Sequence, residues 1–149
     1  MNKDHLSSTS LGTFRNVCLS AHSEGALIAG LTQYKANIYS IDLEKVADKG
    51  LFLDALGKAF NFPTKITNWD AASDLVWEKL IESTANQAAL IFRNSQTLLN
   101  NNLQLFLDVL EFLFGVAEII EREKKSSDTH PVLLRIILLG DGPNFPDWQ

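Results

Sequence analysis

Cysteine is almost absent from this sequence, since Cys18 is the single copy among 149 residues. One cysteine can form neither an internal disulfide nor a cysteine-based metal cage. Cys18 lies in a strand-like segment, where it is most simply a small core residue. An apolar core must therefore stabilise the chain, and a hydrophobic content of 46% can supply one.

Recognisable catalytic motifs are also missing. None of the three histidines (His5, His22 and His130) has a metal-binding spacing such as H-E-x-x-H. The stretch 23–31, SEGALIAGL, follows a candidate strand but has neither G-x-G-x-x-G nor the G-K-[ST] ending of a phosphate loop. We therefore expect no catalytic residue, no metal and no cofactor.

Positive charge is scarce, with 13 Lys and Arg against 18 Asp and Glu and a net charge of −5. This balance argues against a general nucleic-acid binder and permits a basic protein partner. Residues 1–12 contain no apolar run of the kind found in a signal peptide. The most apolar segment, 103–120, is interrupted by a polar stripe typical of a soluble helix rather than a membrane span. We expect a cytoplasmic protein without membrane or nucleic-acid contacts.

Strand-like and helix-like segments alternate along the chain. Candidate strands lie at 13–19, 37–43, 88–92 and 132–139. Candidate helices follow Ser23, Asp48, Asn68 and Asn94 or Ser95, and a long helix covers 103–124. This alternation predicts an α/β fold with a mainly parallel sheet and helices on its faces. The length predicts one domain over 1–149, with a loose leader at 1–10 and an irregular tail at 140–149.

The clearest charge pattern is a row of acids that recurs every fourth residue. The row consists of Asp70, Asp74, Glu78 and Glu82. Asn68, just before the row, is the expected N-cap of a helix over 69–83. Like charges at this spacing weaken a helix by a few tenths of a kcal/mol per pair, so the row calls for an explanation.

Angular positions on the helix separate the acids from the apolar side chains. Successive residues turn by about 100°, which puts Asp74 about 40° and Glu78 about 80° from Asp70. The apolar residues Leu75, Ala72, Val76 and Leu80 fall between about 140° and 280°. The acids therefore face away from the core. Such a row is either a solvated face or a surface kept for a cation-rich partner.

The residues around this row resemble a known family. The segment 41–63, IDLEKVADKGLFLDALGKAFNFP, is followed after a short loop by NWDAASDLVWE at 68–78. Both resemble the barstar family of ribonuclease inhibitors, in which a helix ends in an apolar residue and proline, and an Asn-x-Asp-Ala motif opens the next helix. The resemblance covers about 37–82, and the order of the later elements also fits. It implies a barstar-like layered fold, to which residues 12–33 add the extra strand and helix of larger barstar-like proteins.

The resemblance also implies a function. In the family, two helix aspartates enter the cationic active site of a secreted ribonuclease, where they stand in for substrate phosphates. By position these aspartates are similar to Asp70 and Asp74, and the asparagine at the loop exit is similar to Asn68. The implied activity is that of an immunity protein that binds a basic ribonuclease or toxin domain, in a 1:1 complex.

Several positions depart from the family pattern. The loop 64–67, TKIT, is one residue shorter than the family loop and lacks its aromatic pair and glycine. Lys65 instead adds a cation beside the acids, and we expect it to tune partner choice. Ser73 replaces a residue that is often aromatic or apolar, and either Glu118 or Glu121 could supply the acid that the family uses on its long helix. The predicted partner-binding residues are Asp70, Asp74, Asn68, Trp69, Lys65, Ser73, Glu78, Glu118 and Glu121.

The sequence leaves two other functions open. A protein with this fold could be an adaptor that binds some other basic protein. A small α/β enzyme or nucleotide-binding protein is the second alternative, which turnover by the purified chain would support.

Overall fold

The computed structural model describes residues 17–20, 24–33, 35–82, 87–126, 133–143 and 145. Along the chain its elements are β1 (Val17–Ser20), α2 (Glu24–Gln33), β2 (Asn37–Asp42), α3 (Lys49–Phe60), α4 (Trp69–Glu82), β3 (Gln87–Arg93), α5 (Ser95–Asn101), α6 (Leu103–Ser126) and β4 (Leu133–Leu139). The four strands form one sheet in the order β1-β4-β3-β2, and each neighbouring pair is parallel. The α/β fold with an extra amino-terminal strand and helix is confirmed.

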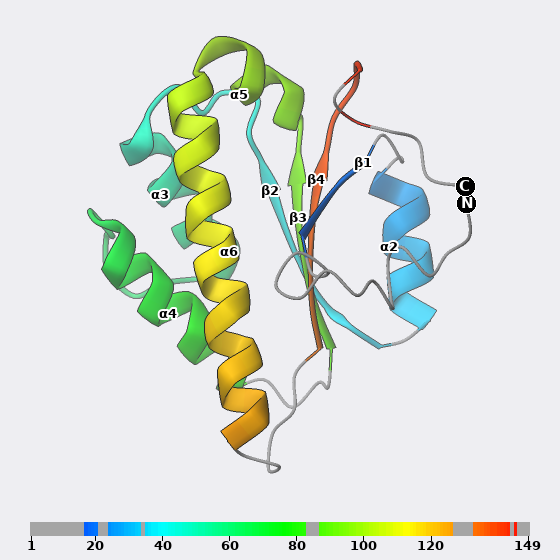
Figure 1. The fold of residues 1–149 in the computed structure, drawn as a ribbon, viewed down its shortest axis with the longest axis vertical. Coiled ribbons are helices and arrows are strands. Elements are labelled where there is room, and N and C mark those ends of the chain that lie inside the picture. Colours follow the sequence, from blue (N-terminus) through cyan, green and yellow to red (C-terminus); the bar gives the residue numbers. More distant parts are fainter. Residues whose placement is uncertain are drawn as a thin grey trace.

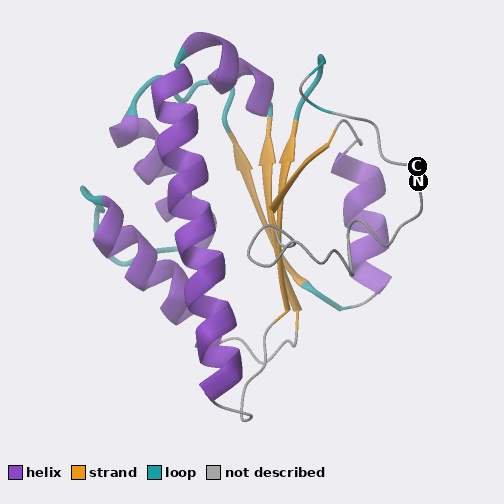
Figure 2. Ribbon diagram, in the orientation of Figure 1, coloured by secondary structure: helices purple, strands orange, loops and turns teal. Residues whose placement is uncertain are grey.

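The helices form two unequal layers (Figures 1 and 2). The long helix α6 lies with α3 and α4 on one face of the sheet, while α2 lies on the other face. α5 sits at the end of the sheet toward which the strands point. Because consecutive parallel strands need a crossover, each connection carries the chain over a face of the sheet and places a helix there.

The central strand β3 shows why the strands are apolar throughout. Ala88, Leu90 and Phe92 belong to the large core beneath α3, α4 and α6. Ala89 and Ile91 point the other way, into a smaller cluster that includes Leu31, Ile137 and Leu139. Side chains alternate between the faces of a strand, so burial of both faces requires a continuous apolar run.

Local signals fix the start of α3, as expected, and also its end. The carboxylate of Asp48 accepts a hydrogen bond of 2.9 Å from the Leu51 N–H, which makes Asp48 the N-cap. At the other end Asn61 adopts the left-handed conformation (φ 57°), and the Phe62 N–H donates to the Gly57 carbonyl over 3.0 Å. This arrangement satisfies a terminal carbonyl of α3 and turns the chain into the loop before α4.

The sequence left open whether Asn94 or Ser95 caps the short helix α5. The structure makes Asn94 the N-cap residue, in the left-handed conformation and without a capping hydrogen bond from its side chain. Its side-chain amide instead donates to Asp42 over 2.8 Å and joins the carboxyl ends of β2 and β3. Ser95 is buried, and its hydroxyl donates to the Phe92 carbonyl over 2.8 Å.

The described residues after β4 belong to no helix or strand, but Phe145 among them is firmly packed. Phe145 is only 3% exposed and belongs to the large core. A side chain at Gly140 would come within 2.9 Å of the Phe145 ring, so this close approach requires glycine. The predicted leader, 1–10, and the three histidines lie outside the described residues. Within those residues, no helix combines the length and apolar character needed to cross a membrane.

Candidate partner-binding surface

The outer face of α4 carries the predicted acids in an accessible position. Asp70, Asp74 and Glu78 are exposed, while Ala72, Val76 and Leu80 are fully buried on the opposite side of the helix. Within the described chain, no ion pair engages any of the three acids. The predicted separation of the charged and apolar arcs is thus confirmed, and three carboxylates remain available to an external cation.

Two residues hold the first turn of α4 in place. Asn68 accepts a hydrogen bond of 2.8 Å from the Ala71 N–H through its side-chain oxygen, and its carbonyl accepts one of 3.2 Å from Ala72. The ring of Trp69 packs against Phe52 and Phe112, with centroid distances of 5.7 and 5.4 Å. The rings come from α3 and α6, so Trp69 anchors α4 to both helices. Asp70 follows Trp69 directly, so the packing of Trp69 also fixes the backbone of Asp70.

Ser73 and Trp77 border the acidic row and are only half-buried. Trp77 packs against the large core, yet its indole N–H is buried without an acceptor among the described residues. A tryptophan three residues after Asp74 lies on the same side of the helix as the acids. Ser73 and Trp77 therefore place a polar and an aromatic side chain beside the carboxylates.

The remaining predicted acids lie on α6, the helix that packs against α4. Glu118 is exposed and Glu121 is half-buried. The structure thus unites Asn68, Asp70, Asp74 and their neighbours on one helix, and it keeps Glu118 and Glu121 on a separate element. A role for either glutamate in binding stays a prediction, and Glu118 is the more accessible of the two.

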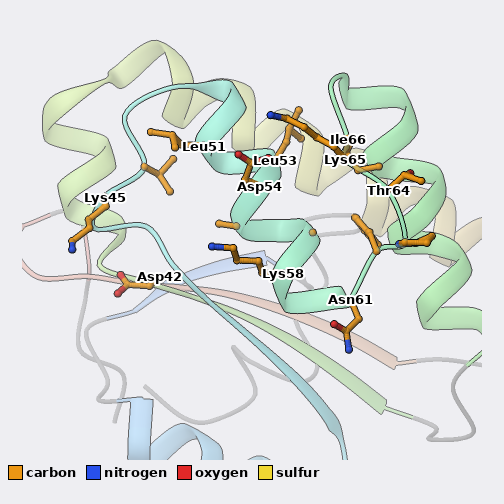
Figure 3. Close-up of a pocket in the computed structure, with 15 residues that line it drawn as sticks. Asp42, Lys45, Leu51, Leu53, Asp54, Lys58, Asn61, Thr64, Lys65 and Ile66 are labelled. Atoms are coloured by element: carbon orange, nitrogen blue, oxygen red, sulfur yellow. The ribbon is translucent and has the colours of Figure 1, made fainter.

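The loop before α4 borders a feature that the sequence did not reveal. An open depression of about 680 Å³ lies along α3, between the chain that follows β2 and the loop that follows α3 (Figure 3). Three exposed lysines line it: Lys45, Lys58 and Lys65. Its other polar side chains are Asp42, Asp54, Asn61 and Thr64, and its apolar lining includes Leu51, Phe62, Pro63 and Ile66. A lysine-lined depression therefore reaches the loop that leads to the acidic helix.

Asp42, at one end of this region, has a shifted acidity. Its pKa is held below the ordinary value, first by the hydrogen bond from Asn94 and then by the Glu44 N–H and the charges of Arg93 and Lys45, against partial desolvation. Lys45 thus has an acidic neighbour at one end of the depression. Lys58 and Lys65 do not contribute to this shift, and the described residues pair neither of them with a carboxylate.

Metal binding has no candidate among the described residues, where no three His, Cys, Asp or Glu side chains are grouped to hold an ion. The surface instead combines carboxylates, lysines and half-buried aromatics, which suits recognition of a charged protein.

Comparison with protein families gives the decisive observation: the model of the barstar family, described as barnase inhibitor, matches residues 36–129.

The chain belongs to the barstar family. The match covers more than half of the 149 residues and extends from the start of β2 through α6. A search of curated proteins found no match to the chain. The family is described as an inhibitor of a protein, and membership supports a protein partner for this chain in general.

Two parts of the chain go beyond the matched barstar segment. β1 and α2 precede residue 36, and they add an edge strand beside β4 and the helix on the second face of the sheet. Within the matched segment, the short loop 64–67 holds Ile66 in the core and leaves Thr64 and Lys65 exposed.

Proposed function

We propose that this barstar-family protein inhibits a ribonuclease toxin by placing the acidic face of α4 in the cationic active site of the enzyme. The observation that supports this most directly is that Asp70 and Asp74 are exposed, unpaired within the described chain and held on a capped, anchored helix. A ribonuclease gathers cationic groups around the scissile phosphate to stabilise the charge of the transition state. Two carboxylates on a rigid helix can occupy the same groups.

Inhibition then follows from occupancy. A carboxylate offers negative oxygens to the cations, as a phosphate does, but it carries no phosphodiester that the enzyme could cleave. Opposite charges on the two proteins speed their encounter, and close charge pairs that lose their water slow the release. The inhibitor would thus bind quickly and dissociate slowly without undergoing any reaction itself, so the proposed role is not enzymatic.

The anchoring of α4 contributes to this function. Asn68 and Trp69 hold the first turn before any partner arrives, so little conformational entropy is lost on binding. Asp70 lies in the first turn of α4, where the helix dipole favours a negative charge. The repulsion among the acids costs a few tenths of a kcal/mol per pair, which is small beside the binding energy of several desolvated charge pairs.

The biological role that fits is an immunity protein in the cytoplasm that forms a 1:1 complex with its toxin. A survival assay tests this role in a bacterial host. Cells produce one of a set of basic ribonuclease toxin domains, barnase among them, with or without this chain. The expected result is survival against at least one ribonuclease, and inhibition of that enzyme by the purified chain at equal molar amounts.

Barstar produced against barnase serves as the positive control for the assay. If barstar protects its cells while this chain protects against none of the ribonucleases, the inhibitor function is wrong. Tight binding to a ribonuclease without loss of its activity would instead identify an adaptor with the barstar fold.

A further inference from the structure

A depression lined by lysines lies next to the loop that leads to the acidic row of α4. Lys58 and Lys65 line the depression along α3. Lys65 belongs to the loop that leads to α4, and the depression lies on the side of this loop that faces α3. Lys65 precedes the N-cap Asn68 by three residues. A partner that covers the first turn of α4 would therefore also reach the loop and the mouth of the depression.

The two lysines differ in their local setting: a helix end accounts for the charge on Lys58, and no helix end accounts for that on Lys65. Lys58 lies in the last turn of α3, where a cation interacts favourably with the helix dipole. Lys65 lies on a loop and has no helix end to stabilise. Figure 3 shows its side chain extending from the loop toward α3, along the opening of the depression rather than away from it.

The negative groups of the depression do not neutralise both lysines. Asp42 is held by Asn94 and lies under the influence of Lys45 and Arg93 at the other end. Asp54 lies on α3 but forms no ion pair with Lys58 or Lys65 within the described chain. Apolar side chains, Leu51 and Phe62 among them, make up much of the remaining lining. The site thus offers unpaired cations beside apolar surface.

We propose that this depression receives an acidic side chain, with its apolar neighbours, from a loop of the same ribonuclease whose cationic site binds Asp70 and Asp74. The charge on Lys58 and Lys65 favours a carboxylate, the apolar lining favours a small hydrophobic contact beside it, and continuity with α4 places both contacts within one interface. This inference rests on the proposed function. It adds that the partner presents a carboxylate beside its cationic active site.

This pattern would provide specificity. A ribonuclease with a cationic active site but a lysine or arginine beside it would face Lys65 with a like charge, which is costly at an interface. A row of acids alone attracts many basic proteins. A surface with both an acidic and a basic patch binds only the few partners whose charges match both patches. A charge at the rim of an interface chiefly changes the association rate, but a charge in a filled depression loses water and also controls release.

The test compares two substitutions with the same change in charge. Lys65→Glu reverses a cation that lines the depression, and Lys49→Glu reverses an exposed cation at the start of α3 that does not line it. The probe is the ribonuclease neutralised in the survival assay, or barnase if several are neutralised. Rates are measured by surface plasmon resonance after thermal unfolding has shown that both variants fold.

The expected result is dissociation about tenfold or more faster for Lys65→Glu than for Lys49→Glu, because a carboxylate would then face a carboxylate. Lys58→Glu should act in the same direction. Replacement of the facing ribonuclease carboxylate by lysine should restore slow release to Lys65→Glu, which would identify the contact. Equal dissociation rates for Lys65→Glu and Lys49→Glu would overturn the inference.

A third variant separates this failure from a failure of the proposed function. If Asp74→Ala weakens binding while Lys65→Glu matches its control, the acidic row acts in binding and only the depression is wrong. If Asp74→Ala also leaves binding unchanged, the proposed use of α4 is wrong, and the inference that rests on it fails as well.

Discussion

α2 and α4 both face solvent from opposite faces of one sheet, yet their outer surfaces differ in kind. The outer side of α2 presents Gly25, Ala26, Ala29 and Gly30, and none of its exposed described side chains is charged. The outer side of α4 presents Asp70, Asp74 and Glu78. A helix of this protein can therefore face solvent without a row of acids. Exposure to solvent does not by itself require the charges on α4, and this agrees with their proposed use in binding.

The largest difference between the two helices should appear in binding. Asp74→Ala should weaken binding to the neutralised ribonuclease by about 2 kcal/mol or more, roughly 30-fold, because it leaves desolvated cations of the partner unpaired. The free energy of unfolding should stay within about 0.5 kcal/mol of the native value, since Asp74 is exposed. Titration calorimetry and urea unfolding measure the two quantities.

Glu82→Ala, at the end of the same row, and Ala29→Ser on α2 are the controls for Asp74→Ala. Both should bind as tightly as the native chain. A loss with Asp74→Ala no greater than with these controls would mean that the outer face of α4 is as inert as that of α2.

The inner sides of the two helices should differ in stability rather than in binding. Leu80 on α4 is fully buried in the large core, whereas Leu31 on α2 is 9% exposed and packs in the smaller cluster. Truncation of a buried leucine to alanine costs about 2–5 kcal/mol. We expect Leu80→Ala near the upper end and Leu31→Ala near the lower end, as measured by urea unfolding. A larger loss at Leu31 would show that α2 contributes more to the fold than its small cluster indicates.

On the outer side of α2 we expect a smaller effect, a gain in stability rather than a loss. Gly30 is exposed, and a side chain there would meet no atom within 4 Å. Gly30→Ala should therefore raise the free energy of unfolding by about 0.5–1 kcal/mol, since glycine loses more conformational freedom in a helix than alanine does. Thermal unfolding measures this gain. A loss of stability would show that another part of the protein covers this side of α2.

The smallest predicted effect concerns a carboxyl group away from both helices. The pKa of Asp42 is lowered in the folded chain by the Asn94 hydrogen bond, so its contribution to stability is present above the unfolded pKa of about 3.9. That contribution is lost as the pH falls through the folded pKa. Asp42→Asn should therefore flatten the pH dependence of the unfolding free energy below about pH 4. Parallel curves for the native chain and the variant would contradict this role.

The sequence predicted most of what is local in this protein. The period of α4 separates its acids from Ala72, Val76 and Leu80 within a few residues, and Asn68 marks where the helix starts. Asp48 marks the start of α3 in the same way. The strand candidate at 132–139 corresponds to β4. These features depend on neighbours a few positions apart along the chain, so periodicity and capping chemistry determine them before any tertiary contact forms.

Only the tertiary structure decided which distant residues meet. Trp69 fits the predicted binding surface by its place in the motif, but Phe52 and Phe112 hold its ring as an anchor between three helices. Phe145 belongs to an irregular tail, yet it completes the core. The depression joins the turn after β2, the side of α3 and the loop before α4, so the place of Lys58 and Lys65 on one surface is visible in no single segment. Such contacts arise when crossovers pack helices onto the sheet, and this packing depends on the shapes of side chains throughout the core.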